Sequence, residues 1–394
     1  MMRRFTRYLL WEIGKIFAVS LVAFTSIIML GGIVQRLITT GIGPQVIFEL
    51  IPYILPMGLQ FALPATLLFA VASVYGRIAA DNEIVAVKAA GVPPIRVIAP
   101  TLILGFLFSP VAVWLNDLAA SWGLAGINQV IMQQSEEVVY RHLKMEGSYS
   151  DRNFSIHVQA VEGKDLIHPT ITFHSSSGKP LTICAQSAQL RFNPENETLK
   201  ILLVDSEVDQ GDSFIGHLPG LNSREIPLNN TPSGPGTARP SSIALRQIAE
   251  ETNHQTEKLR QLEELISAHT LMGLSAGRYD WLGSAKMAEL SSQLTLGTER
   301  LNKLRTEPWR RWANGFSCFF FVWMGVPLAI WWRTADYWTS FGICFLPILL
   351  IYYPLFMLGA EQAKDGNLPP YSVWLGNFAL LLIGAWFLRK VNRW

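Results

Sequence analysis

The sequence predicts an α-helical membrane protein with six transmembrane helices, three on each side of an inserted β-domain that is followed by a helical segment. Three observations lead to this fold class. Half of the 394 residues are hydrophobic and only 16% are charged, a balance typical of membrane proteins. Six apolar runs are long enough to span a bilayer. Residues 117–311 form one long polar stretch between the third and the fourth run.

The first three apolar runs precede the polar stretch. Residues 16–35 carry no charge and follow a basic, aromatic start. This run is too long for a signal peptide and no A-x-A pattern follows it, so we expect an uncleaved first span. Residues 50–76 contain three prolines, which usually kink a spanning helix. The third run covers residues 97–116.

A short capped helix is expected between the second and the third span, at residues 81–91. Asp81 or Asn82 can cap its first turn, and Glu83 places a negative charge near the positive helix end. Gly91 and two prolines end it. The helix is too short and polar to span a bilayer. It is either an ordinary surface helix or a docking point for a soluble partner. The residues that share one face are Ile84, Val87 and Ala90.

The polar stretch has a β-like part and a helical part. Short β-prone runs separated by turn residues predict a sandwich or jelly-roll between about 135 and 230. The expected strands are 153–160, 170–174, 181–186, 188–192 and 199–204. A Pro/Gly-rich linker follows at 231–240. Apolar periodicity then predicts helices at 243–268 and at about 281–305, the second running into the fourth span.

Three more apolar runs close the chain, at residues 312–332, 337–360 and 366–388. The predicted domains are therefore residues 1–116 with spans one to three, 117–240 with the β-domain and linker, 241–308 with the helical segment, and 309–394 with spans four to six.

Basic residues in the short segments predict the orientation. If the N-terminus is cytoplasmic, the outer short loops hold only Arg36 and Lys364. The inner segments then hold Arg3, Arg4, Arg7, Lys15, Arg77, Lys88, Arg96, Arg333, Arg389, Lys390 and Arg393. We expect both termini and the 81–91 helix in the cytoplasm and the large insertion outside the inner membrane.

Motifs for chemistry are few. Residues 273–277 match the G-x-S-x-G pattern of serine hydrolases at Ser275, with His269 nearby, but a helix pattern precedes it, which favours a helix-ending loop. No phosphate-binding G-x-x-x-x-G-K-[ST] loop occurs. We therefore expect no catalysis, no cofactor and no nucleic-acid partner.

Histidines in the β region could hold a metal, although their irregular spacing favours solvated side chains. They are His157, His168, His174 and His217. The three cysteines form no C-x-x-C pair, which argues against a zinc site or a disulfide framework.

Two charged residues have two interpretations each. Arg36, at the outer end of the first span, either reaches the interface to stay hydrated or grips a phosphate bidentately. Glu83 either complements the dipole of its helix or pairs with a basic residue of a cytoplasmic subunit.

Three segments resemble the LptF/LptG permeases of the lipopolysaccharide exporter. Residues 76–91, GRIAADNEIVAVKAAG, are similar to the coupling-helix segment of that family. Residues 325–328, GVPL, are similar to its fourth-span motif. Residues 359–377, with LPP and WLGN, resemble its last loop and span. The order of spans and β-domain is also similar.

The resemblance implies a transporter subunit without its own ATPase. Its partners would be a cytoplasmic LptB-like ABC ATPase dimer, a second LptF/LptG-like permease, periplasmic LptC/LptA-like jelly-roll proteins and a membrane lipid. The implied ATPase-docking residues are Asp81, Glu83, Ile84, Val87 and Lys88. Spans one and five would line a lateral gate and a lipid cavity. The implied lipid-contacting residues are Arg36, Phe24, Ile28, Phe341, Phe345 and Leu349.

Two other functions remain open from the sequence. One is a mechanotransmission subunit of an ABC-type complex, in which no substrate crosses the membrane. The other is a membrane-bound hydrolase that uses Ser275.

Overall fold

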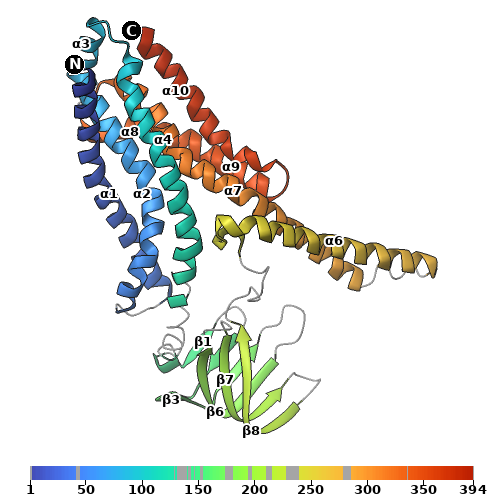
Figure 1. Ribbon diagram of the computed structural model, residues 1–394. Helices are drawn as coiled ribbons and strands as arrows, with labels where there is room; N and C mark the ends of the chain where they lie inside the picture. The colour runs from blue at the N-terminus through green and yellow to red at the C-terminus, as the bar shows by residue number, and fades with distance from the viewer. Residues whose placement is uncertain are drawn as a thin grey trace. The chain divides into compact units, whose positions relative to one another are not determined.

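The computed structural model describes residues 2–40, 45–127, 129–130, 140, 143–145, 147–150, 154–173, 181–193, 198–209, 215–227, 239–277, 285–334 and 336–393. The chain forms two compact units. One contains Met1–Gly31, Pro52–Leu124 and Arg239–Trp394, and the other contains Gly32–Ile51 and Ala125–Ala238. Figure 1 shows the helices of the first unit and the sheet of the second.

Within the described residues, six helices are long and apolar enough to cross a membrane, in agreement with the predicted number. Three precede the strands along the chain: α1 (Met2–Thr40), α2 (Gln45–Ala80) and α4 (Pro94–Leu118). Three follow: α7 (Ala285–Trp332), the fifth span with α8 (Tyr337–Pro347) and α9 (Tyr353–Lys364), and α10 (Leu375–Arg393). α2 stays one helix through its three prolines.

The fifth span contains a π-helical turn, η5 (Ile348–Tyr352), between α8 and α9. Pro347 ends α8 directly before this turn, because proline has no N–H to continue the helical ladder. A second π-turn, η1 (Ala119–Gly123), follows α4. Such turns mark places where a helix departs from its regular hydrogen bonding.

The helix α3 (Glu83–Ala89) lies between α2 and α4, so a short helix in this position is confirmed and only its limits are narrower. The predicted side-chain cap is wrong: Asn82 has φ of 59° and makes no capping hydrogen bond. The left-handed backbone of Asn82 turns the chain out of α2 instead. Gly91, with φ of 80°, ends the segment as predicted.

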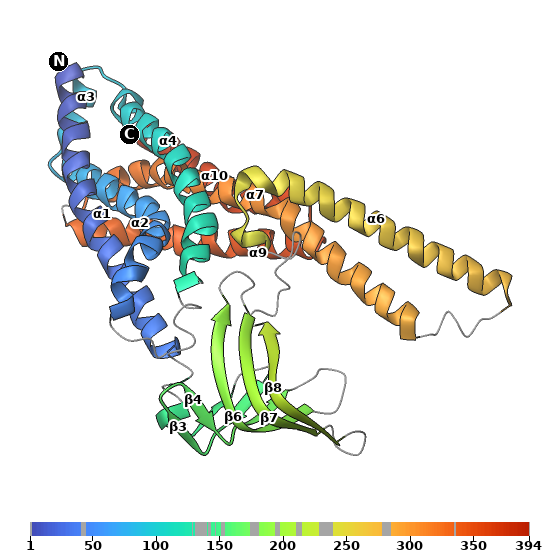
Figure 2. The ribbon, with the colours of Figure 1, turned by 60° about the horizontal axis from the view of Figure 1, so that its bottom comes forward.

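The predicted helical segment forms a hairpin. α6 (Leu245–Ser275) and the first part of α7 lie side by side (Figure 2), and α7 continues without a break into the fourth span. The end of α6 at Ser275 confirms that a helix precedes the G-x-S-x-G motif. Ser275 Oγ donates to the carbonyl of Met272 at 3.0 Å, as in a helix terminus.

The described part of the second unit contains an eight-stranded sheet in which all strand pairs are antiparallel. Its strands are β1 (Ser148–Ser150), β2 (Phe154–His157), β3 (Ala160–Glu162), β4 (Asp165–Ile167), β5 (Thr170–Phe173), β6 (Leu181–Asn193), β7 (Thr198–Asp209) and β8 (Ile215–Pro227). The path is β1-β2-β5-β6-β4-β3, and β7 pairs with both β6 and β8. The sheet is curled rather than divided into two layers (Figure 2).

The strand prediction was wrong in several places. Residues 181–186 and 188–192 belong to one strand, β6, whereas the described residues of the predicted strand 153–160 are divided between β2 and β3. β1, β4 and β8 were not predicted. The inner face of the sheet buries alternate apolar residues, among them Ile156, Ile171, Ile183 and Ile201. Tyr140 crosses this core: its hydroxyl donates to the carbonyl of Lys164 and accepts from the N–H of Leu190.

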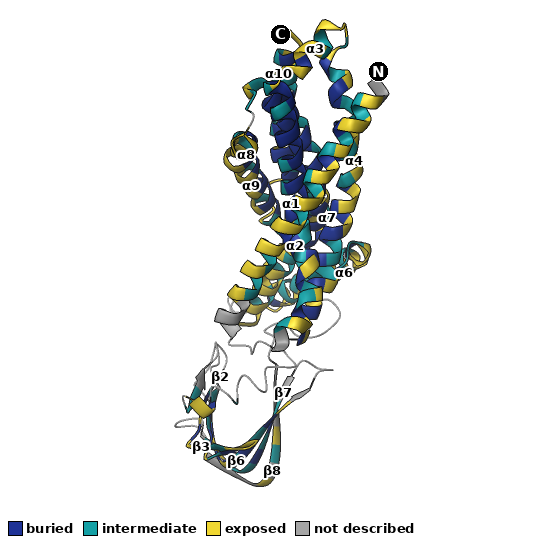
Figure 3. Ribbon diagram, turned by 90° about the vertical axis from the view of Figure 1, so that its left-hand side faces the viewer, coloured by how far each residue is buried: buried dark blue, intermediate teal, exposed yellow. Residues whose placement is uncertain are grey.

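The membrane helices pack around α7. In the most apolar 18-residue stretch of α7, 78% is buried inside the protein. Gly105 of α4 lies against the side chain of Val322 of α7, and Gly315 of α7 lies against the side chain and backbone of Val113, so the two helices approach closely at both glycines. Hydrogen bonds add to this packing: Asn377 of α10 donates to the carbonyl of Ala313 at 2.9 Å. By contrast, only 11% of the corresponding stretch of α1 and 22% of that of the fifth span are buried (Figure 3).

A buried ion pair joins the hairpin to the spans. Arg311 of α7 is fully buried and donates to Asp117 of α4 at 2.6 Å. It also donates to the carbonyls of Ser241 and Ile243 at 3.1 and 2.7 Å. The same Asp117 oxygen accepts the N–H of Leu245, the first residue of α6, at 2.8 Å. One guanidinium therefore fixes α4, α6 and α7 at a single point.

We expect Arg311→Leu to destabilise the helical unit by about 3 kcal/mol or more, because it leaves a carboxylate and two carbonyls without their donor. Thermal unfolding of the purified chain in detergent measures the effect. Arg260→Leu is the control: Arg260 pairs with Glu264 at 3.2 Å and both side chains are exposed, so its loss costs about 1 kcal/mol or less. Equal shifts for the two variants contradict the anchoring role.

Candidate functional site

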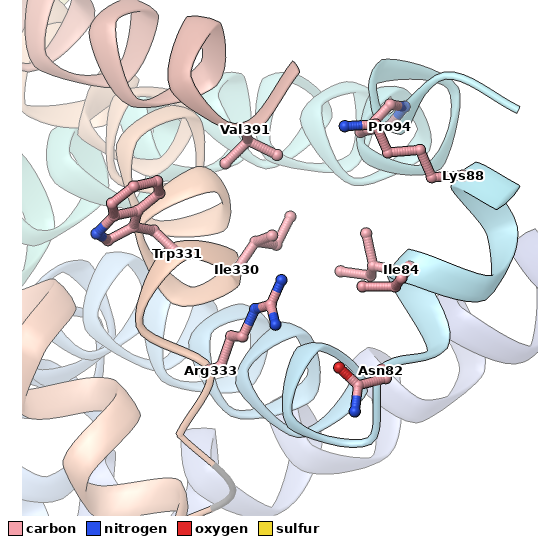
Figure 4. A pocket seen from close by; sticks show the side chains of 9 residues that line it. Asn82, Ile84, Lys88, Pro94, Ile330, Trp331, Arg333 and Val391 are labelled. Carbon is pink, nitrogen blue, oxygen red and sulfur yellow. The ribbon is translucent and has the colours of Figure 1, made fainter. Parts of the chain in front are cut away.

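The helix α3 presents charge outward and is held by apolar residues inward. Asp81 and Glu83 are exposed. Ile84 is only 7% exposed and belongs to the hydrophobic core of the helical unit, and Val87 packs against that core. Lys88 is half-buried and lines a cavity together with Ile84 (Figure 4). Of the five predicted docking residues, the two acids are therefore the most accessible, and Ile84 is covered by its own chain.

The end of α2 connects α3 to two other spans. Gly76 lies against Thr334 and Ser340 at the start of the fifth span, so closely that a Cβ would overlap the carbonyl of Thr334 at 2.8 Å. Arg77 donates to Glu12 of α1 at 3.1 Å and to the hydroxyl of Tyr337 at 3.4 Å. A displacement of α3 would thus act directly on the ends of α1 and α8.

The first turn of α8 is fixed by Asp336. Its carboxylate accepts from the Thr339 hydroxyl at 2.5 Å and from the Thr339 N–H at 2.9 Å. These two donors hold the pKa of Asp336 below its ordinary value. The cap keeps Tyr337 and Trp338, which follow directly, in place at the end of a groove.

This groove, of about 530 Å³, lies between α1, α2 and α8. Its wall is largely apolar, with Glu12 and Lys15 among its lining residues; the other residues that line it are Ile16, Val19, Ser20, Ala23, Phe24, Phe69, Tyr337 and Trp338. Glu12 and Lys15 pair with each other at 2.6 Å. An apolar groove with a charged group among its lining suits an amphiphile.

Aromatic rings from three spans meet at the groove. Phe24 of α1 lies 6.1 Å from Phe69 of α2 and 6.2 Å from Phe341 of α8, between ring centroids. Phe69 lies 5.4 Å from Phe341 and 5.5 Å from Trp338. Phe341 stacks on Phe345 at 5.2 Å. We call Phe24, Phe69, Trp338, Phe341 and Phe345 the aromatic cluster. These rings pack at ordinary aromatic distances and hold α1 against α8 without any hydrogen bond between them.

The structure brings three of the predicted lipid-contacting residues together, namely Phe24, Phe341 and Phe345. Of the predicted residues with described side chains, only Phe24 lines the groove itself. Ile28 is half-buried on α1, and Leu349 is exposed in the π-turn η5. Arg36 lies in the last part of α1, and its side chain is outside the described part of the chain.

Phe69 and Trp338 were missed. Phe69 lies in a span so uniformly apolar that its hydropathy gives no face, and Trp338 follows the cap at the membrane interface, where tryptophan is common. For Trp338, its aromatic side chain at the start of the fifth span was the signal that could have indicated this role.

Metal and hydrolase chemistry find no support among the described residues, which include no group of three His, Cys, Asp or Glu that could hold a metal ion. His157 and His168 are exposed. His174 and the side chain of His217 lie outside the described residues.

The fold and these sites define a multi-pass membrane protein with an apolar groove and a short charged helix between two spans. The family model described as Lipopolysaccharide export system permease LptF/LptG matches residues 7–390. The chain belongs to this family of inner-membrane permeases for lipopolysaccharide export, as the resemblance implied. None of the curated proteins compared with it matches.

Cysteines introduced together as Phe24→Cys and Phe341→Cys should be joined by a short bifunctional thiol reagent, because the two rings are in contact beside the groove, with centroids 6.2 Å apart. Peptide mass spectrometry detects the link. Cys184 is exposed and is first replaced by serine, whereas Cys318 and Cys344 are buried. The control pair combines Phe24→Cys with Phe378→Cys, an exposed position on α10. Linkage of the control pair at the same yield would contradict the contact between α1 and α8 at Phe24 and Phe341.

Proposed function

We propose that this chain extracts lipopolysaccharide from the inner membrane with energy supplied by a cytoplasmic ATPase dimer of the LptB kind. It would act beside a second LptF/LptG-like subunit and pass the lipid to periplasmic LptC/LptA-like jelly-roll proteins. Its six helices would cross the membrane as three plus three with both termini inside, and its β-domain would serve as a jelly-roll-like periplasmic module.

The observation that carries the proposal is the path from α3 to the groove. The exposed acids Asp81 and Glu83 follow the end of α2. In the last turns of α2, Gly76 lies against α8, and Arg77 bonds to both α8 and α1. An ATPase that moves α3 would therefore shift the two spans that border the groove. The family membership supports the substrate class.

The energetic requirement explains why a motor is needed. Transfer of acyl chains into water costs about 0.8 kcal/mol per methylene, so a lipid with several chains costs tens of kcal/mol to extract without shelter. The groove would shelter the chains within the membrane, and the curled sheet, with its apolar inner face, would receive them outside.

The groove also favours a permease over a mechanotransmission subunit, because a subunit that transports nothing has no need of an apolar opening of about 530 Å³ between its spans. Ile84 and Val87 would anchor α3, and Asp81 and Glu83 would present its outward charges to the ATPase. Arg36 would meet a phosphate of the lipid at the outer end of α1.

Glu83→Arg should weaken association with the ATPase by about 2 kcal/mol or more, because reversal replaces an attraction by a repulsion at a desolvated contact. The fraction of ATPase that co-purifies in mild detergent measures it. Glu289→Arg is the control, since Glu289 is equally exposed but lies on the hairpin part of α7. Unchanged co-purification for Glu83→Arg rules out the docking role.

Arg36→Ala should raise the lipopolysaccharide concentration that half-stimulates ATP hydrolysis about tenfold, the effect of one lost charge-assisted hydrogen bond. The assay uses the complex reconstituted in vesicles. Arg4→Ala, an exposed arginine near the other end of α1, serves as the control. An identical response for Arg36→Ala and the parent leaves only the interpretation that Arg36 stays hydrated at the interface.

A further inference from the structure

A second cavity, of about 260 Å³, lies at the α3 end of the helical unit. Residues of α3, of the start of α4, of the end of α7 and of the end of α10 line it, so four segments distant in sequence form one site (Figure 4). It is separate from the groove, because the two share no lining residue.

The floor of this cavity is apolar. Ile84, Ile330 and Val391 contribute it, and each is 6–7% exposed. Pro94, the first residue of α4, closes one side and is buried. Trp331 forms another wall (Figure 4). Because apolar side chains form this floor, contact with methylene or glycerol carbons is more favourable there than contact with water.

Among the residues that the structure describes, two cations and no carboxylate line the same cavity. The guanidinium of Arg333 extends between Ile330 and Ile84, and Lys88 approaches from α3 (Figure 4). Arg333 has φ of 49°, a backbone conformation that costs a non-glycine residue energy. This turn directs its side chain back over the end of α7.

A third cation reinforces the positive charge of this wall. Lys390 Nζ lies 3.8 Å from the ring centroid of Trp331 and 4.9 Å from that of Trp386, which are cation–π distances. Tryptophans and basic residues at the ends of spans mark the level of lipid headgroups. The cavity therefore combines positive charge, an apolar floor and headgroup depth.

We propose that this cavity binds the phosphate of an anionic membrane phospholipid, with Arg333 and Lys88 on the phosphate and the apolar floor under its glycerol carbons. Arg333 can grip two phosphate oxygens at once, and Lys88 supplies a point charge. Basic pockets between transmembrane helices are known to hold such headgroups. The inference requires only that the six helices cross a membrane, and it stands or falls apart from the lipid-export proposal.

Bound phospholipid would also hold α3 in place. Ile84 and Lys88 belong to one wall, whereas Ile330 and Val391 belong to the core helices α7 and α10. A headgroup between them bridges the short helix to the core. The site therefore adds a lipid contact to the element proposed to receive the ATPase.

The test uses the full chain reconstituted in vesicles of equal parts phosphatidylglycerol and phosphatidylcholine, extracted in mild detergent and analysed by native mass spectrometry. We expect retained phosphatidylglycerol in excess of phosphatidylcholine. Arg333→Gln and Lys88→Gln should each lower that excess about fivefold, the ratio that corresponds to about 1 kcal/mol per basic residue at a membrane surface. Arg389→Gln removes a charge from the exposed face of α10 and should leave the excess unchanged.

Two results overturn the proposal. Equal losses for Arg389→Gln and Arg333→Gln show only a general attraction to the anionic surface. Displacement of the lipid by inorganic phosphate at equal concentration shows a site for free phosphate instead. Arg333→Lys keeps the charge and should restore part of the excess, and thermal unfolding of each variant separates loss of lipid from loss of fold.

Discussion

The helical unit depends on one buried guanidinium. Arg311 contacts Asp117, two carbonyls near residue 242 and, at 3.7 Å, Glu307. A buried charge is tolerated when it is paired and hydrogen-bonded, and here the partners come from α4, the segment just before α6 and α7 itself. Because Gly315 contacts Val113 one turn away, the ion pair and the closest helix–helix approach share one location. α4 and α7 consequently form a rigid frame from which the hairpin of α6 extends.

Around this frame the spans differ in how firmly they are held. α7 and α2 are largely enclosed by protein, whereas α1 and the fifth span are mostly uncovered. The fifth span is also interrupted by Pro347 and a π-turn. Elements with little buried surface move at low cost. The two least enclosed spans are those that border the aromatic cluster, so opening of the groove leaves the packing of α4 and α7 intact.

Much of this organisation was predictable from the sequence, for identifiable physical reasons. A membrane-spanning helix requires a long apolar run, and such runs are easily recognised in a sequence, so all six spans were predicted. The helix α3 was found from Glu83 and from the glycine and prolines that end it. β8 was missed because its residues 215–227 include two prolines and two glycines, which are rare in strands, and lack apolar alternation. β6 was divided because its polar residues resemble a turn.

The site was less predictable because it depends on tertiary contacts. Phe24 and Phe341 were selected from the family resemblance, but Phe69 became part of the aromatic cluster only through the packing of α2 between them. Arg311 was taken as the end of the polar stretch, since its burial requires Asp117, which is 194 positions away in the chain. The cavity at Arg333 needed four segments and a left-handed turn, which local sequence did not indicate.

If this chain extracts lipopolysaccharide, the lipid should enter the groove between α1, α2 and α8. A photoreactive phenylalanine analogue placed at Phe24 tests this entry in cells that contain the ATPase, with the same analogue at Trp386, an exposed site on α10, for comparison. We expect covalent attachment of lipopolysaccharide at Phe24 and little at Trp386. Attachment at Trp386 equal to that at Phe24, or none at Phe24, would contradict it.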